Sequence, residues 1–224
     1  CVGIRSCALC RDPALREALG LHPARSPAAS APRAELRLTS VGGPVVHFED
    51  GRVMPAGELP VPLTGFDILH DVVLDEHEEL DMLQTMEAWP WQPSQSGRWK
   101  QDFGPRANFK KRLIKVPEDF RGLPRYAHTL LERVCSRCEA LRDFQSVECL
   151  VLRYDEARGA NHDFHVDDTW LWGDRIVGVT LASPTVFTFY EPASNLAVRV
   201  PLPRRSAYLL SGNARYLWQH GILA

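Results

Sequence analysis

The chain of 224 residues contains 45% hydrophobic and 24% charged residues, which supports a sizeable core and excludes wholesale disorder. Its 26 basic residues against 28 acidic ones give a net charge of −2. This balance excludes a nucleic-acid-binding protein that acts through bulk positive charge. No apolar stretch approaches the ~20 residues of a transmembrane helix, and the first residues lack the pattern of a secretion signal. We therefore expect an intracellular protein with no membrane partner.

The first 44 residues are predicted to be a Cys-rich start followed by a linker rich in Ala and Pro. Cys1, Cys7 and Cys10 have a spacing typical of metal ligands, so this start is a candidate zinc site. The chain opens at Cys1 without a methionine and stops at Ala224 inside a predicted strand. We therefore expect both ends to be cut.

Residues 45–147 are predicted to form an N-terminal extension with two helices. Asp75 and Glu78 have the spacing of an N-terminal capping box, and the helix that they begin should end near residue 89. A second helix is expected over residues 125–141, where apolar residues form one stripe.

From residue 148 to the end, the pattern changes to short apolar runs separated by turn signals, which predicts strands. We expect them near residues 148–155, 163–168, 176–182, 185–191, 196–202, 206–211 and 214–222. Helices followed by many short strands favour an α+β protein that is mostly β with flanking helices. The predicted core is a double-stranded β-helix, or jelly roll, of about eight strands. Because seven strands are expected here, the last one should follow Ala224.

One group of side chains in this core suggests a metal centre. His165 and Asp167 lie two residues apart in a predicted strand, so they project to the same face. His220 lies in the last predicted strand, on the face that it shares with Tyr216 and Trp218. Two imidazoles and one carboxylate with open positions describe a non-haem Fe(II) oxygenase site, although the same ligands also suit a hydrolytic zinc site. His162 is a competing ligand in a less favourable register.

Five sequence segments together point to a known family. They are GIRSCALC (3–10), QSGRWKQDFGPRANFKK (95–111), HVDDTWLWGDR (165–175), SPTV (183–186) and ARYLWQH (214–220). With the spacing of His165, Asp167 and His220, these segments resemble the AlkB family of Fe(II)- and 2-oxoglutarate-dependent dioxygenases. The likeness is greatest to the branch that is associated with demethylating a lysine of actin.

The resemblance implies roles for particular residues. His165, Asp167 and His220 match the Fe(II) ligands, and 2-oxoglutarate and O₂ are the implied co-substrates. Arg153 and Tyr154 match an Arg-Tyr pair whose tyrosine hydroxyl contacts 2-oxoglutarate. The family anchors the carboxylate of 2-oxoglutarate with an arginine after the last histidine, but this chain stops four residues after His220. This chain alone is therefore expected to bind 2-oxoglutarate poorly.

Residues 98–115 are rich in basic residues with aromatic residues interleaved, and the resemblance makes this segment a substrate lid. Its candidate contact residues are Arg98, Trp99, Lys100, Lys110 and Lys111. A solvated hairpin is the alternative interpretation of the same pattern.

The resemblance implies oxidative N-demethylation in the cytoplasm and nucleus. Monomethylated lysine in actin is the first candidate substrate, and N6-methyladenine in DNA is the second. The related chains carry one more cysteine before this start, which would complete a four-thiolate Zn(II) site with Cys1, Cys7 and Cys10.

A hypothesis of another class is a non-catalytic adaptor, in which the Cys-rich start and the basic segment dock partners on a vestigial jelly roll. The oligomeric state is left open.

Overall fold

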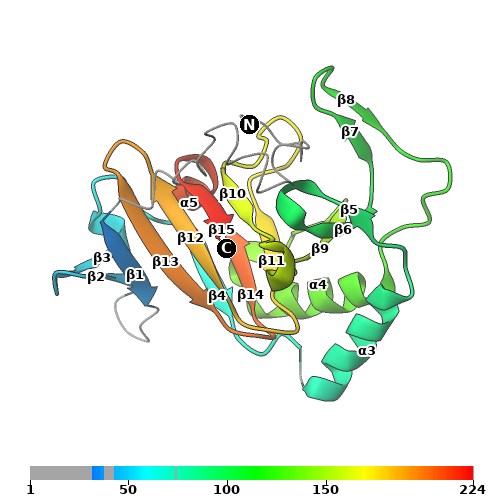
Figure 1. Ribbon diagram of the computed structural model, residues 1–224, viewed down its shortest axis with the longest axis horizontal. Helices are drawn as coiled ribbons and strands as arrows, with labels where there is room; N and C mark the ends of the chain where they lie inside the picture. Colours follow the sequence, from blue (N-terminus) through cyan, green and yellow to red (C-terminus); the bar gives the residue numbers. More distant parts are fainter. Residues whose placement is uncertain (1–31, 38–42, 74, 224) are drawn as a thin grey trace, which may run out of the picture.

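The computed structural model describes residues 32–37, 43–73 and 75–223 (Figure 1). Two β-sheets form its centre. The larger sheet has seven strands in the order β10 (His162–His165), β15 (Gln219–Ile222), β12 (Thr185–Glu191), β13 (Leu196–Leu202), β1 (Arg33–Arg37), β2 (Val45–Phe48) and β3 (Val53–Pro55). The smaller sheet has three strands in the order β11 (Ile176–Val179), β14 (Ala207–Leu210) and β4 (Phe66–Leu69). All pairs are antiparallel except β1 with β13.

The two sheets pack face to face over one apolar core. Phe66 of β4 contacts Phe187 and Phe189 of β12, with ring centroids 5.9 and 5.0 Å apart. Side chains alternate along a strand, and β14 uses both of its faces. Leu210 belongs to the core between the sheets, whereas Leu209 belongs to the core under the helices. This sandwich matches the predicted jelly roll and draws the strands β1 to β4 from before residue 148.

Two helices, α3 (Glu76–Glu87) and α4 (Arg125–Arg137), cover the outer face of the smaller sheet (Figure 1). The side chain of Asp75 accepts a hydrogen bond from the backbone N–H of Glu78 at 2.8 Å, which confirms the predicted cap. The carboxylate of Glu78 pairs with Arg133 of α4, with an N–O distance of 2.8 Å. This ion pair joins the two helices. No helix among the described residues has the length and apolar character to cross a membrane.

Beside the helices lies a small sheet of three strands, β5 (Gln92–Pro93), β6 (Trp99–Phe103) and β9 (Cys149–Arg153). Between β6 and β9 the chain forms a separate hairpin of two strands, β7 (Arg106–Asn108) and β8 (Leu113–Lys115). Figure 1 shows this β7–β8 hairpin standing out from the body of the molecule.

The strand predicted over residues 214–222 needs a correction. Its first half is the helix α5 (Gly212–Tyr216), and only Gln219–Ile222 are extended as β15. Two contacts hold α5 against the loop before β4, because the Asn213 side chain donates to the carbonyl of Pro62 and the N–H of Ala214 donates to that of Thr64. Tyr216 is 44% exposed and does not share the inward face with Trp218 and His220. These long-range contacts outweigh the local alternation of side chains.

Candidate metal centre

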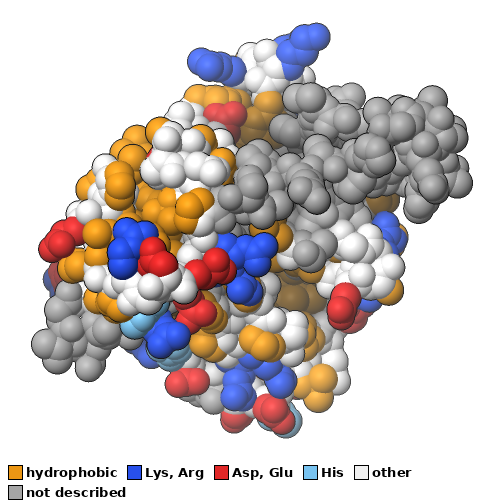
Figure 2. All heavy atoms as spheres, turned by 60° about the vertical axis from the view of Figure 1, so that its left-hand side comes forward, with side chains coloured by type: hydrophobic (Ala, Val, Ile, Leu, Met, Phe, Trp, Pro, Cys, Tyr) orange, Lys and Arg blue, Asp and Glu red, His pale blue; other side chains and the backbone are white. Residues whose placement is uncertain are grey.

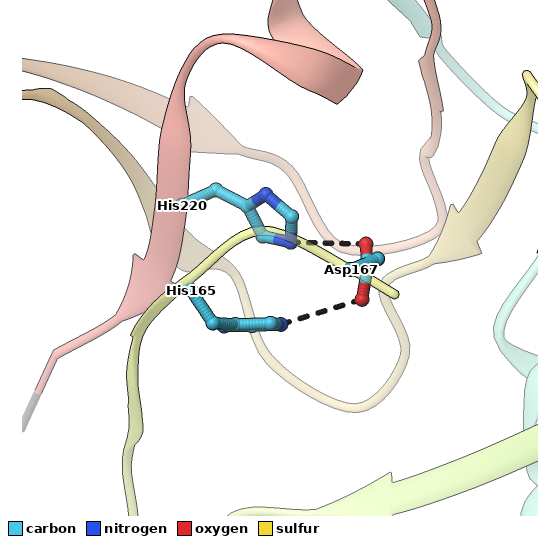
Figure 3. Close-up of side chains that lie close together, drawn as sticks. All are labelled: His165, Asp167 and His220. Atoms are coloured by element: carbon cyan, nitrogen blue, oxygen red, sulfur yellow. Dashed lines mark ion pairs between the residues drawn. The ribbon is translucent and has the colours of Figure 1, made fainter. Parts of the chain in front are cut away.

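His165, Asp167 and His220 converge at one end of the larger sheet (Figure 3). His165 and His220 are directly opposite one another on the paired strands β10 and β15, which brings their imidazoles together. Asp167 lies just beyond the end of β10. Its two carboxylate oxygens are 3.4 Å from Nε2 of His165 and 3.3 Å from Nε2 of His220. Among the described residues this is the group suited to hold a metal ion, with one potential ligand atom from each residue and all three within 4.8 Å.

The spacing and chemistry of this group fit a first-row transition metal. Metal–ligand bonds of about 2.1 Å at right angles place neighbouring ligand atoms about 3 Å apart, close to the observed separations. Nδ1 of His165 lies 2.9 Å from the carbonyl oxygen of Asp163, so this nitrogen carries the proton and Nε2 offers its lone pair to the centre. Two imidazoles and one carboxylate suit Fe(II) and leave further coordination positions open.

The packing around His220 favours its neutral, ligand-ready form. Its side chain is buried, and the ring of Phe187 stacks on it with centroids 5.2 Å apart and an interplanar angle of 15°. Burial lowers the pKa of His220 despite the opposing effect of Asp167. Gly221 follows immediately, and a Cβ there would lie 2.5 Å from the carbonyl oxygen of His162. Only glycine therefore allows β15 to approach β10 this closely.

The loop that carries Asp167 is held by a buried arginine. Arg215 of α5 is fully buried, and its Nη1 and Nη2 donate to the carbonyl oxygens of Asp167 and Asp168 at 2.8 and 3.2 Å. Burial by itself would raise the pKa of Asp167, but hydrogen bonds from His165 and His220 lower it well below its usual range. Asp167 is thus an anion in a fixed position.

Arg153 and Tyr154, the predicted co-substrate residues, have different surroundings. The hydroxyl of Tyr154 is 3.5 Å from Nδ1 of His162, and the ring of His162 stacks on that of His165 with centroids 4.0 Å apart. Burial lowers the pKa of His162 to about 3, so its ring is neutral near pH 7. The guanidinium of Arg153 instead pairs with Glu87 of α3 at 3.1 Å. Tyr154 therefore belongs to the surroundings of the metal centre.

The five predicted lid residues are divided between two places. Arg98 is 4% exposed, and Trp99 and Lys100 are half-buried in β6, where the ammonium of Lys100 pairs with Asp102 at 2.7 Å. Lys110 and Lys111 are exposed in the turn of the β7–β8 hairpin. The hairpin therefore presents only part of the predicted lid to solvent.

Aromatic side chains connect the hairpin to the metal loop. The ring of Phe109 lies 6.3 Å from that of Trp170 and 5.9 Å from that of Trp172, measured between centroids. The indole N–H of Trp172 donates to the carboxylate of Glu148 at 2.7 Å. Because both tryptophans follow Asp167 closely in the chain, the hairpin lies against the same loop that supplies a metal ligand.

Two findings lie outside the predicted site. Arg215 is not among the predicted site residues, because in a strand over residues 214–222 it would lie on the face opposite His220. The pattern that could have revealed Arg215 is a basic residue among buried neighbours, and only the helical conformation of α5 accounts for that pattern.

Cys1, Cys7 and Cys10 lie outside the described residues, so the zinc site remains a prediction.

The fold and the sequence both match known proteins. The solved structure of OsALKBH1 superimposes with a TM-score of 0.51, at 14% sequence identity, over 70% of this chain and 84% of that one. Residues 76–224 match the family described as the 2OG-Fe(II) oxygenase superfamily. The structural match supports the predicted jelly-roll fold.

Proteins of similar sequence narrow the family assignment. The chain is 36% identical to the alpha-ketoglutarate-dependent dioxygenase alkB homolog 4 of Mus musculus, over 72% of this chain and 63% of that relative. It is 34% identical to the DNA N6-methyl adenine demethylase of Caenorhabditis elegans, over 73% of this chain and 56% of that relative. The chain thus spans less than two thirds of either relative. It belongs to the 2OG-Fe(II) oxygenase superfamily and is similar to the AlkB homologues within it.

Proposed function

We propose that the protein is an Fe(II)- and 2-oxoglutarate-dependent dioxygenase that removes N-methyl groups by oxidation. The observation that carries this proposal is the convergence of His165, Asp167 and His220 within 4.8 Å at the end of a jelly-roll sheet. In the proposed site these three side chains hold Fe(II), and the hydroxyl of Tyr154 orients 2-oxoglutarate. The family match and the AlkB homologues support the same assignment.

When bound, Fe(II) with 2-oxoglutarate and O₂ supplies the oxidant that hydroxylates an N-methyl group. One oxygen atom enters succinate, which forms as 2-oxoglutarate loses CO₂, and the other enters the methyl group. The hydroxymethyl amine then releases formaldehyde and leaves the demethylated amine. The protein contributes a buried, neutral His220 and an anionic Asp167.

Monomethylated lysine in actin is the first proposed substrate, acted on in the cytoplasm and nucleus. It rests on the resemblance of the five sequence segments to the actin-associated branch. N6-methyladenine in DNA is the second candidate, and two observations favour it. A relative that is 34% identical is described as a DNA N6-methyl adenine demethylase. The β7–β8 hairpin also exposes five basic residues and no acidic one, as expected of a surface that contacts phosphates: Arg106, Lys110, Lys111, Arg112 and Lys115.

The test is a parallel assay with Fe(II), 2-oxoglutarate and O₂. A monomethyl-lysine actin peptide and N6-methyladenine DNA are incubated separately, and succinate, formaldehyde and substrate mass are measured. We expect product formation with one substrate and its loss in His165→Ala. If neither substrate nor other methylated amines release formaldehyde while the protein still binds them, the adaptor hypothesis is favoured instead.

A further inference from the structure

The loop between β10 and β11 carries Asp167 and, shortly after it, Trp170 and Trp172. Trp172 is half-buried, and its backbone is held within this loop. Its N–H donates to the carbonyl oxygen of Asp168 at 3.3 Å, and its own carbonyl oxygen accepts from Nη2 of Arg215 at 3.5 Å. The same arginine donates to the carbonyl oxygen of Asp167 at 2.8 Å. The backbone of Trp172 is therefore tied to the residue that supplies the carboxylate ligand.

The side chain of Trp172 is held from outside the loop. Its indole N–H donates to a carboxylate oxygen of Glu148 at 2.7 Å, and a charged acceptor makes such a bond strong. Its ring lies 5.9 Å from that of Phe109, measured between centroids, and Phe109 belongs to the turn of the β7–β8 hairpin. Trp172 thus contacts the hairpin with its side chain and the support of Asp167 with its backbone.

Glu148 also lies at the base of the hairpin. Gly104 leads from β6 into the hairpin, and a Cβ there would lie 3.0 Å from Cα of Glu148. The chain that enters the hairpin therefore passes directly over the residue that holds Trp172. Among the strands that the structure describes, β7 and β8 pair only with each other. The position of the hairpin relative to the metal loop accordingly depends on this close approach and on the aromatic contacts of Phe109.

We propose that Trp172, held by Glu148, is a positioning residue that couples the β7–β8 hairpin to the metal centre. A macromolecule on the hairpin fixes the ring of Phe109, and Trp172 passes this constraint to the backbone that carries Asp167. The methylated macromolecule and the metal ion then bind cooperatively, each raising the affinity for the other by the same factor. The inference rests on the proposed function, because it takes the hairpin as the substrate surface and the three ligands as the metal site.

The alternative role of Trp172 is to fill space between the hairpin and the loop. Large aromatic side chains are common packing anchors. Packing alone requires no hydrogen bond to a carboxylate, whereas the indole of Trp172 has one, and its backbone contacts lead to one particular ligand. The two roles differ in what they change. A packing residue changes stability, and a coupling residue changes how two binding events affect each other.

The first experiment is a double-mutant cycle on metal affinity, which needs no substrate. Mn(II) binding is titrated by electron paramagnetic resonance in wild type, Phe109→Leu, Trp172→Phe and the double variant. We expect each single change to weaken Mn(II) binding about three- to tenfold, and the double variant to be no weaker than Trp172→Phe alone. Trp91→Phe is the matched control, because the indole of Trp91 also donates to a carboxylate, that of Glu87, but outside the metal loop. This control should keep the Mn(II) affinity within about twofold of wild type.

The second experiment measures the cooperativity itself. The Mn(II) titrations are repeated with saturating N6-methyladenine DNA and, separately, with monomethylated actin, without 2-oxoglutarate so that no turnover occurs. We expect the probe that binds the wild-type protein to raise its Mn(II) affinity about 5- to 20-fold, and Trp172→Phe and Glu148→Ala to remove most of this rise. Glu148→Gln should retain the rise, because its amide oxygen still accepts the indole hydrogen bond.

The outcomes separate coupling from packing. Additive losses in the cycle, or a bound substrate that leaves the Mn(II) affinity of wild type unchanged, would overturn the proposal. A lower Tm in Trp172→Phe, with the effect of substrate on Mn(II) binding intact, would make Trp172 a packing residue. If the wild-type protein binds no Mn(II), the metal site of the proposed function fails. If it binds Mn(II) but neither probe, only the proposed substrates fail, and the cycle on Phe109 and Trp172 still decides the coupling.

Discussion

The metal centre and the β7–β8 hairpin are built in opposite ways. His220 is 5% exposed, and the centre is fixed by a cross-strand pair, a stacked phenylalanine and a buried arginine. The hairpin pairs only with itself and leaves Phe109, Leu113 and Ile114 more than half exposed. Figure 2 shows Lys and Arg side chains at the highest point of that view, where the hairpin stands out in Figure 1.

This difference assigns separate tasks to the two regions. Chemistry that depends on the position of three side chains needs a rigid, buried frame. Recognition of a large substrate is a surface property, and a projecting strand pair can change its sequence without disturbing the core. The two regions meet through Phe109, Trp170 and Trp172. We therefore expect substitutions in the centre to abolish turnover and substitutions in the hairpin to alter substrate affinity.

The largest effect is expected from Asp167→Asn. The amide has the same shape but no negative charge, so the two histidines lose their anionic partner and the metal loses its carboxylate ligand. We expect metal affinity to fall by more than the 10- to 100-fold typical of outer-shell changes, with loss of turnover. Equilibrium dialysis with Fe(II) under anaerobic conditions measures this loss.

Asp163→Asn is the matched control for this substitution. Asp163 lies two residues before His165, and its carboxylate accepts a hydrogen bond from Ser96 instead of facing the centre. Its backbone carbonyl, which orients His165, is unchanged by the substitution. Metal affinity that fell equally in both variants would show that net charge matters here and the position of Asp167 does not.

The sequence predicted the metal ligands better than the residues that hold them in place. His165 and Asp167 lie close together as predicted, although only His165 belongs to β10 and Asp167 follows its end. His220 meets His165 because β15 pairs with β10 in the register that sets these two residues opposite one another. The role of Arg215 is not visible in the sequence because it depends on α5, which is held by a loop contact 151 residues away in the chain. Arg98 was assigned to an exposed lid because a basic run carries no sign that one member is buried.

A smaller effect is expected from Arg215→Leu, which tests whether the frame sets the position of Asp167. The change leaves the carbonyls of Asp167 and Asp168 without their donor, at a cost of about 3 kcal/mol in the free energy of unfolding. Metal affinity of the folded protein should fall about 10- to 100-fold, with partial recovery in Arg215→Lys. Denaturant unfolding and metal titration give the two quantities separately. An unchanged metal affinity would mean that the loop holds Asp167 without α5.

The smallest of these effects, and one confined to recognition, is expected from reversing charge on the hairpin. Lys110→Glu with Lys111→Glu changes the net charge by −4 at the exposed turn and leaves the three metal ligands unchanged. The KM for the methylated macromolecule should rise about tenfold at low ionic strength, because the attraction that steers an acidic partner is lost. 2-Oxoglutarate affinity should stay the same, since neither residue reaches the centre. The difference from wild type should shrink in salt, as the screening length falls from about 10 Å at 0.1 M to about 3 Å at 1 M.

The control for the hairpin variant makes the same charge change on β1 of the larger sheet. Arg33→Glu with Arg37→Glu also changes the net charge by −4, but β1 lies on the opposite side of the molecule from the hairpin (Figure 1). If both double variants raise KM equally, the substrate responds to total charge and the hairpin has no special part in recognition. If only the hairpin variant does so, and its effect depends on salt, the surface that selects the substrate is the projecting strand pair. In that case Phe109 links substrate binding at the hairpin to the loop that carries Asp167, because its ring contacts both Trp170 and Trp172.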